Sequence, residues 1–336
     1  MSNKARNIFF LIGLVAVILM VVTFDISLSD LWHHIQTAGY WLPIILVLWI
    51  VLYMMNALTW RVLILGSGDC PINYWRLLKW TITGFALNTA TPVGLLGGEP
   101  YKIMEAKTYI GTQRATSSVV LFSMMHVFSH FCFWGAAIVL YLLLAALDIL
   151  PLDTLLSILI ALMGLFSAAG LYFFMLGYRY GLVLRLIHWV GHIPGLKKWA
   201  TSFADTHADD LNEIDRQISE LHAQRREHFY AAWALEFTGR AMQSLEIFFI
   251  LLLFKAGDAS LLTFIHSFII LAFTSLFANL LFIIPLQLGG REGGFAMSVA
   301  QMGMTAAVGF FISLICRVRE IFFTIIGLLL MKIKNQ

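Results

Sequence analysis

The feature that most constrains this chain is a series of apolar stretches. Each is close to or above the roughly 20 residues that a helix needs to cross the hydrocarbon core of a bilayer. They cover 7–24, 41–62, 115–147, 154–177, 229–254, 261–284 and 305–331. Only 12% of the residues are charged, whereas soluble domains carry about 25%. The sequence therefore predicts an all-α, polytopic integral membrane bundle that forms a single membrane domain over residues 1–336.

Composition and motifs also exclude several classes of protein. The net charge of +3 is too small to indicate a nucleic-acid partner. The cysteines Cys70, Cys132 and Cys316 lie far apart and show no metal or disulfide spacing. The chain has no Walker A loop, GxSxG elbow or dinucleotide fingerprint. We therefore expect no cofactor, no metal site, no catalytic residues and no enzymatic activity.

Two apolar segments, 79–110 and 285–303, fit a full crossing poorly because proline and paired glycines interrupt them. The expected hinge residues are Pro92, Gly97 and Gly98 in the first segment, and Pro285, Gly289 and Gly290 in the second. Each break follows an apolar helix that contains an asparagine, Asn88 in one case and Asn279 in the other. Backbone that is not helical is tolerated at membrane depth only where it is buried in protein or lines a cavity. Both segments are therefore predicted to be re-entrant broken helices.

Lysine and arginine near the span ends predict the orientation. Lys4 and Arg6 place the N-terminus in the cytoplasm, and no small-residue cleavage site follows the first apolar run, so we expect an uncleaved span. The first break then enters from the cytoplasm and the second from the opposite face, as in an inverted repeat. Both termini are then cytoplasmic, and we expect the protein to lie in the cytoplasmic (inner) membrane. The alternative, a full crossing by 261–284, leaves the C-terminal tail outside.

Segment 178–228 is the polar part of the chain and is predicted to be a cytoplasmic amphipathic helical segment. Its apolar stripe consists of Leu211, Ile214, Ile218 and Leu221, which follow helical 3-4-3 spacing. The stripe favours a helix that lies on the membrane or packs on the bundle. A role in binding a partner is the alternative.

Charged residues beside the breaks are candidates for ligand contacts. Glu99 opens a helix whose N-terminus attracts anions. It either satisfies that helix end itself or takes part in a site, as ionisable residues within a membrane commonly do. Arg291 and Glu292 are the counterparts in the second break. Arg291 either binds a lipid phosphate or forms an internal ion pair with Glu292 or Glu99.

Further polar residues lie within the apolar spans. Glu236, Arg240 and Gln243 share one helical face, and Glu246 is offset from it. Glu236 and Arg240 either complete a cavity, pair with each other, or sit at the membrane interface near the cytoplasmic end of the span. In the last span Arg317 and Glu320 are spaced to pair as i and i+3.

His126 and His130 are spaced as i and i+4 in the span 115–147. That spacing can bind a metal, but the Glu of HExxH is missing and no third ligand is evident. A hydrogen-bonded polar pair that lines the bundle is therefore the favoured interpretation. Whether this span contributes to a site stays open.

Taken together, these motifs resemble the flippase-like transmembrane domain of lysyl-phosphatidylglycerol synthase. The matching residues are Pro92, Gly97, Gly98, Glu99, Pro100 and Lys102, then Gly290, Arg291 and Glu292, then Arg317. The sequence departs from the family at Phe122, Ser123 and His126, where members usually carry a Glu-Arg pair and then an Asp. The resemblance spans most of the chain, from the first span to Arg317.

The resemblance implies lipid translocation rather than lysyl transfer. Aminoacyl transfer belongs to a soluble domain of the family, and this chain ends at Gln336, just after its last span. The expected substrate is an anionic phospholipid or a lipid-linked headgroup. Its expected ligands are Glu99, Arg291, Glu292, Arg240, Arg317, Asn88, Asn279 and Lys102.

Other functions and partners remain open from the sequence. The chain could instead be an ion-coupled transporter of a small polar solute, a membrane enzyme with Glu99 or Glu292 as general base, or a scaffold for a lipid-modifying protein. The expected partners are membrane lipids, a second copy of the chain in a homodimer, and a lipid-modifying enzyme. The identity of the lipid, the direction of movement and the driving force are not encoded in any motif.

Overall fold

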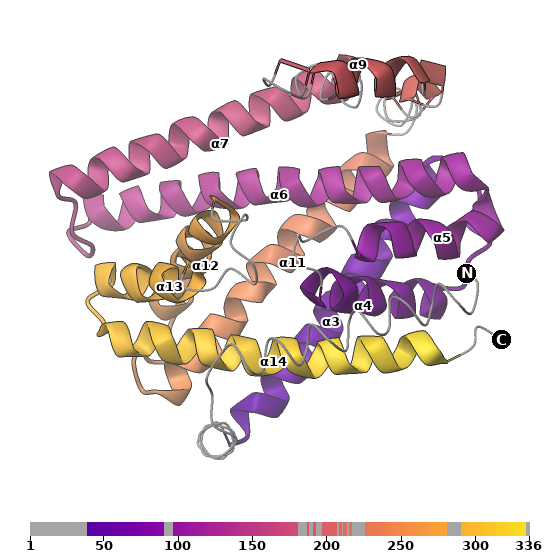
Figure 1. The fold of residues 1–336 in the computed structure, drawn as a ribbon. Coiled ribbons are helices and arrows are strands. Elements are labelled where there is room, and N and C mark those ends of the chain that lie inside the picture. The colour runs from indigo at the N-terminus through magenta and orange to yellow at the C-terminus, as the bar shows by residue number, and fades with distance from the viewer. Residues whose placement is uncertain are drawn as a thin grey trace.

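The computed structural model describes residues 39–90, 97–180, 187, 191–192, 197–206, 208–209, 211–213, 215–216, 226–280 and 290–333. In these ranges the regular structure is helical, without strands (Figure 1). The helices are α3 (Trp41–Gly66), α4 (Tyr74–Ala90), α5 (Gly98–Ile110), α6 (Thr112–Ala146), α7 (Thr154–Tyr180), α9 (Lys197–Thr206), α11 (Arg226–Leu253), α12 (Leu261–Leu280), α13 (Gly290–Gln301) and α14 (Ala306–Lys332). The expected span 7–24, the hinge residues Pro92, Pro285 and Gly289, and Ile214, Ile218 and Leu221 of the apolar stripe lie outside the described residues.

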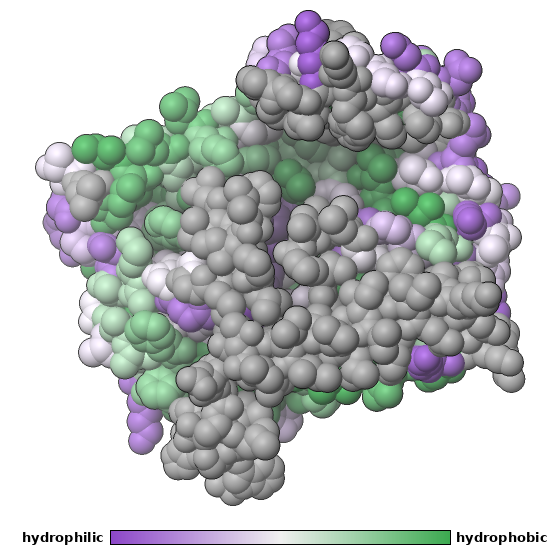
Figure 2. Space-filling model, viewed as in Figure 1, coloured by the Kyte–Doolittle hydropathy of each residue, from purple (hydrophilic) through white to green (hydrophobic). Residues whose placement is uncertain are grey.

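Four helical segments are long and apolar enough to cross a membrane: Trp41–Gly66, Thr112–Ala146, Leu156–Met175 and Leu261–Asn279. Helices α11 and α14 are also long, with 28 and 27 residues, but charged side chains interrupt their apolar sequence. The prediction of an all-helical, multi-pass membrane protein is thus confirmed. Hydrophobic side chains cover much of the surface around α6 and α7, while hydrophilic ones gather near α9 and the right-hand edge (Figure 2).

Short helices flank the two predicted breaks. Helix α5 has 13 residues and α13 has 12, so at 1.5 Å per residue each is about 20 Å long. That is less than the hydrocarbon thickness of about 30 Å. Both helices begin at a predicted hinge glycine, Gly98 in α5 and Gly290 in α13.

Each short helix runs back along the helix before it. At the start of α4, Arg76 Nη1 donates a hydrogen bond to the hydroxyl of Tyr109, near the end of α5, at 2.8 Å. In the second pair, the hydroxyls of Thr274 and Ser298 lie 3.3 Å apart and Gly294 packs beside Thr274. Helices α4 and α5 are therefore antiparallel, and so are α12 and α13.

The close crossing of α4 and α5 depends on glycine. A Cβ atom on Gly98 would lie 2.2 Å from the carbonyl oxygen of Gly84 and 2.7 Å from Asn88 Oδ1. Glycine at this position therefore lets the start of α5 approach the backbone of α4, which brings the first turn of α5 against Asn88.

Buried aromatic side chains hold the bundle around this crossing. Trp60 on α3 and Trp80 on α4 are fully buried, with ring centroids 6.2 Å apart. The indole of Trp60 donates to Ser118 Oγ on α6 at 3.2 Å. Helix α3 also packs along α11, and α4 packs along α14. These contacts fix α3, α4, α6 and α11 around a common space.

Candidate functional site

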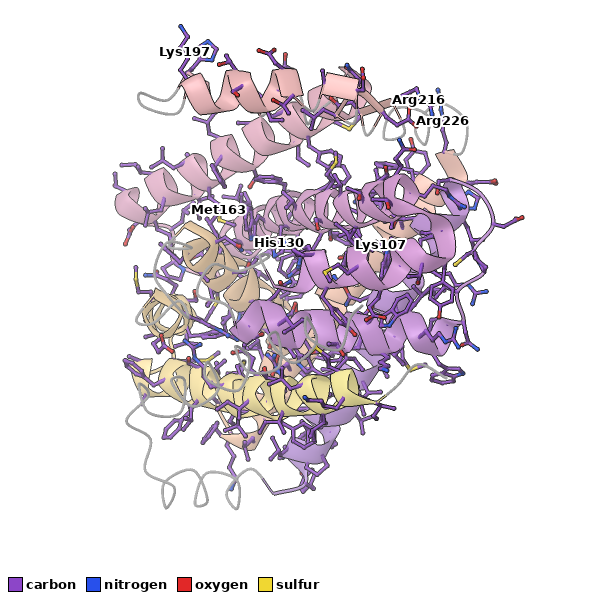
Figure 3. All side chains as sticks on the ribbon, turned by 45° about the vertical axis from the view of Figure 1, so that its right-hand side comes forward. Lys107, His130, Met163, Lys197, Arg216 and Arg226 are labelled. Atoms are coloured by element: carbon purple, nitrogen blue, oxygen red, sulfur yellow. The ribbon has the colours of Figure 1, made fainter. Side chains whose placement is uncertain are left out.

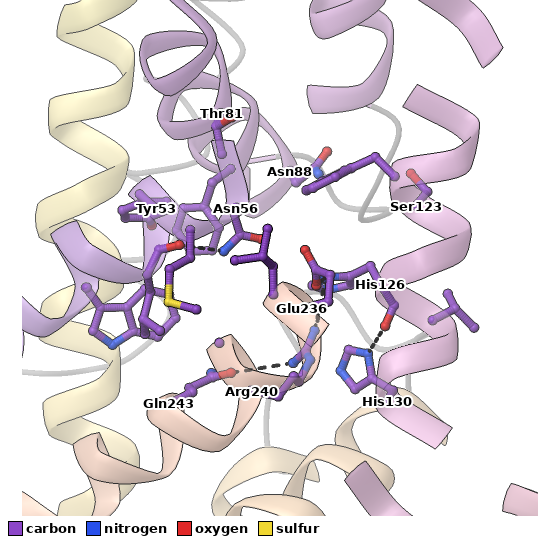
Figure 4. A pocket seen from close by; sticks show the side chains of 18 of the residues that line it. Tyr53, Asn56, Thr81, Asn88, Ser123, His126, His130, Glu236, Arg240 and Gln243 are labelled. Atoms are coloured by element: carbon purple, nitrogen blue, oxygen red, sulfur yellow. Dashed lines mark hydrogen bonds and ion pairs between the residues drawn. The ribbon is translucent and has the colours of Figure 1, made fainter. Parts of the chain in front are cut away.

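A cavity of about 390 Å³ lies between α3, α4, α5, α6 and α11 (Figure 4). Its volume is in the range of about 300–1,000 Å³ that is typical of ligand sites. Helix α3 supplies a largely apolar wall that includes Trp49, Leu52 and Tyr53. The other helices supply the polar and charged groups, and Asn279 lines the cavity from the end of α12.

One charged group of the cavity forms at the start of α5. Glu99 Oε1 accepts hydrogen bonds from Lys102 Nζ at 3.2 Å and from Asn88 Nδ2 at 3.3 Å. The Asn88 side chain also accepts the backbone N–H of Gly98 at 2.7 Å. Asn88 therefore pairs with one of the backbone N–H groups at the α5 N-terminus, a role that the sequence analysis had offered to Glu99 as one option. The same side chain orients the Glu99 carboxylate. Lys102 is only 4% exposed and lies 4.6 Å from the centre of the Phe122 ring.

The second charged group joins α6 and α11. His126 Nδ1 lies 3.1 Å from Glu236 Oε2, and Arg240 Nη2 lies within hydrogen-bond distance of His126 Nε2 (Figure 4). A neutral His126 that donates from Nδ1 and accepts at Nε2 satisfies both partners, and this tautomer follows from the partners. Glu236 and Arg240 are thus bridged by His126, where the sequence had suggested a direct pair. Arg240 Nη1 also reaches Gln243 Oε1 at 3.5 Å.

Two atoms of this group retain unused hydrogen-bonding capacity. Glu236 Oε1 and Arg240 Nε are buried and have no hydrogen-bond partner among the described residues. Buried polar atoms are nearly always paired, so an unpaired acceptor and an unpaired donor on one cavity wall call for an explanation. A bound polar ligand or water would supply the missing partners.

His130 lies one turn after His126 in α6 and also lines the cavity. Its Nδ1 donates to the backbone carbonyl of His126 at 3.0 Å, and its ring packs against His126 with centroids 5.0 Å apart. Within the described ranges, no group of three or more His, Cys, Asp or Glu side chains is placed to hold a metal ion. The geometry fits the predicted hydrogen-bonded pair.

A separate ion-pair network connects α11, α13 and α14. Arg291 pairs with Glu320, and Arg317 Nη2 lies 2.9 Å from Glu292 Oε1. The prediction that Arg291 pairs with Glu292 or Glu99 is therefore wrong, because Glu320 on α14 faces Arg291 more directly. The predicted i, i+3 pair of Arg317 with Glu320 is present at 3.9 Å.

The structure thus divides the predicted ligands into two sets. Glu99, Lys102, Asn88, Arg240 and Asn279 line the cavity. Arg291, Glu292 and Arg317 belong to the ion-pair network, and none of them is among the residues that line the cavity.

Sequence reasoning missed one pair that is central to this network. Arg319 Nε and Nη2 each donate to a different oxygen of Glu246 at 3.0 Å. The Arg319 guanidinium also lies 3.6 Å from the centre of the Trp49 ring, which lines the cavity. The available signal was that an arginine inside an apolar span requires a buried partner, and Glu246 had been left without one.

The fold and the site define a multi-pass helical membrane protein with a cavity that is lined by charged side chains of α5 and α11. The model of the family described as Lysylphosphatidylglycerol synthase TM region matches residues 10–327, and the chain belongs to this family. The resemblance seen in the sequence is therefore confirmed. Searches of curated proteins and of solved structures each found no match.

Proposed function

We propose that the protein is a lipid flippase or scramblase that moves a phospholipid or lipid-linked headgroup across the cytoplasmic membrane. The observation that carries this proposal is that Arg240 and Glu236, two charged residues that line a cavity in a membrane bundle, each keep one buried atom without a hydrogen-bond partner among the described residues. A headgroup phosphate would accept from Arg240. A hydroxyl or ammonium group of the same headgroup would donate to Glu236.

The part of the lining that comes from α5 supports the same assignment. Lys102 and Glu99 place a second cation and a second anion on the cavity lining. The formal charges of Glu99, Lys102, Glu236 and Arg240 cancel, so an empty cavity carries little net charge. A headgroup that combines a phosphate with hydrogen-bond donors matches such a wall better than a simple inorganic ion does.

We further propose that the two broken helices are re-entrant and form an inverted repeat. The helices α3–α4–α5–α6 and α11–α12–α13–α14 follow the same order of lengths: a long helix, a shorter one, a short one and again a long one (Figure 1). Paired broken helices in transporters mark a substrate site near the bilayer midplane. The basic residues Arg76, Lys107 and Arg114 near the start of α4 and the end of α5 support a cytoplasmic position for that end of the bundle.

The test is translocation of a fluorescent phospholipid by the purified protein in liposomes. Arg240→Gln and Lys102→Gln should each lower the rate about tenfold or more, because each change costs a charged hydrogen bond of roughly 1.5–3 kcal/mol. Lys107→Gln is the matched control, since Lys107 is exposed on the same helix as Lys102. It should leave the rate unchanged.

Two results would count against this proposal. Unchanged rates in both Arg240→Gln and Lys102→Gln would exclude the cavity as the headgroup site. Uptake of a small solute under an ion gradient, with no lipid movement, would favour the transporter alternative.

Glu99→Ala should abolish translocation through the cavity. Arg291→Ala should instead act through the ion-pair network, so that its loss of activity is accompanied by a loss of thermal stability.

A further inference from the structure

A second concavity, of about 320 Å³, lies between α7, α12 and α13. We call it the apolar groove. Met163 and Phe166 line it from α7, Phe273 and Leu276 from α12, and Met297 from α13. Figure 3 shows Met163 on the side of α7 that faces α12. The hydroxyl of Ser298, which also lines the groove, donates to the carbonyl of Gly294 at 2.7 Å, so it needs no partner from within the groove.

The helices that line the groove favour a position at the depth of the hydrocarbon core. Two of its walls come from segments that are long and apolar enough to cross a membrane, Leu156–Met175 and Leu261–Asn279. Its contents are therefore apolar groups that reach it from the bilayer. Apart from Ser298 and Gln301 the lining is apolar, so a soluble polar ligand would lose its hydration there and find few hydrogen-bond partners in exchange.

The groove adjoins the charged cavity. On α12, Leu276 lines the groove, and Asn279, one turn later, lines the cavity. On α6, the ring of Trp134 lies 5.6 Å from His130 of the cavity and 6.1 Å from Phe166 of the groove, measured between centroids. The indole of Trp134 donates to Ser275 Oγ on α12 at 2.9 Å. Trp134, which lines neither compartment itself, therefore connects a residue of the polar compartment to a residue of the apolar one.

We propose that the apolar groove receives an acyl chain of the same lipid whose headgroup occupies the charged cavity. This inference rests on the proposed function. An amphiphile has a polar and an apolar part joined by a short linker, and the cavity and groove are a polar and an apolar compartment whose lining residues lie within one turn of each other on α12. A second copy of the chain would need an apolar surface to cover the groove, but it would not need the adjoining charged cavity.

The groove contributes selectivity rather than affinity. Lipid tails are as apolar as leucine side chains, so a chain gains little free energy of transfer when it moves from the bilayer into the groove. Close packing against Met163, Phe166 and Leu276 instead favours chains that fill the groove without strain. We therefore expect the protein to discriminate between chain lengths, and we expect this discrimination to depend on the groove.

The test uses the full-length protein in lipid nanodiscs with a phospholipid that carries a photoreactive diazirine near the end of one acyl chain. Labelled peptides should come from the groove segments of α7, α12 or α13. Met297→Trp should lower this labelling about tenfold, because the larger side chain takes up space that the acyl chain would fill. Met297 is 53% exposed, so the larger side chain can be placed without disturbing the core.

Leu165→Trp is the matched control. Leu165 is 69% exposed on α7 and does not line the groove, so labelling in this variant should equal that of the wild type. A short-chain analogue with a photoreactive headgroup reports on the cavity alone. Its labelling should fall in Arg240→Gln and should be unchanged in Met297→Trp.

The outcomes separate the two proposals. The acyl-chain assignment would be overturned if acyl-chain labelling is absent from the groove or is unaffected by Met297→Trp. The proposed function would still stand in that case if headgroup labelling depends on Arg240. If neither probe labels its compartment in the wild-type protein, the proposed function would be overturned as well. Crosslinks through the groove between two copies of the chain would overturn the acyl-chain assignment in favour of a dimer interface.

Discussion

Neutralising Glu246 should destabilise the bundle strongly, because its carboxylate compensates a buried arginine. The side chains of Glu246 and Arg319 are 2% and 1% exposed, and two hydrogen bonds of 3.0 Å connect them. Removing one partner of a buried ion pair costs about 3–5 kcal/mol, since the other charge remains buried and uncompensated. The pair joins α11 to α14, so its loss also loosens the packing behind the cavity wall.

Two remaining contacts of Arg319 set the expected magnitude. Glu320 Oε1 lies 3.7 Å from Arg319 Nη1, and the ring of Trp49 lies 3.6 Å from its guanidinium. Both stabilise the cation when Glu246 is neutral. Glu320, however, is already shared with Arg291 and Arg317. We therefore expect Glu246→Gln to lower the free energy of unfolding by about 3 kcal/mol, the lower end of that range.

Equilibrium unfolding in mixed micelles measures this effect. Glu227→Gln is the control, because Glu227 lies on the same helix with its side chain 84% exposed, and it should stay within about 0.5 kcal/mol of the wild type. The double variant Glu246→Leu with Arg319→Met should recover most of the loss, since apolar residues often replace a buried pair at little cost. A loss below about 1 kcal/mol in Glu246→Gln would refute the reasoning.

Two further changes test the crossing of α4 with α5 and the loop before α12. Gly98→Ala should cost about 2 kcal/mol or more in unfolding experiments, since its Cβ would lie 2.2 Å from the carbonyl oxygen of Gly84. Gly293→Ala, which meets open space, should be tolerated. Hydrogen bonds from Ser260 and Thr263 lower the pKa of Asp258. The stability that these hydrogen bonds give to the folded protein is lost as pH falls through the folded-state pKa of Asp258. Ser260→Ala should raise this pKa in an NMR titration.

The helices were largely predictable because hydropathy and helix breakers are local properties. The expected spans 41–62 and 229–254 correspond to Trp41–Gly66 and Arg226–Leu253. The glycine pairs in the two breaks likewise mark the starts of α5 and α13 at Gly98 and Gly290. A membrane span must satisfy its backbone hydrogen bonds internally, so a proline and glycine break is informative even in a single sequence.

The partners of the charged residues were not predictable in the same way. Arg291 stands next to Glu292 in the sequence, yet it pairs with Glu320, while Glu292 pairs with Arg317. His126 departs from the family pattern, yet it joins Glu236 to Arg240 on the cavity wall. Such choices depend on how α6, α11, α13 and α14 rotate about their axes, and the sequence of one helix does not determine its rotation against another.

The two breaks, although similar in sequence, carry their charges to different places. In the first, Glu99 pairs with Lys102 and Asn88 of its own helical hairpin, and all three line the cavity.

In the second break, Arg291 and Glu292 pair with Glu320 and Arg317 of α14. A ligand can replace the partners of Glu99 without separating helices that are distant in the chain. A ligand that took the place of Glu320 beside Arg291 would have to break a buried network between α13 and α14 and leave its charges uncompensated. Under the proposed function, the residues after the first break would therefore exchange partners with a headgroup, while the ion pairs after the second break would hold α13 and α14 together.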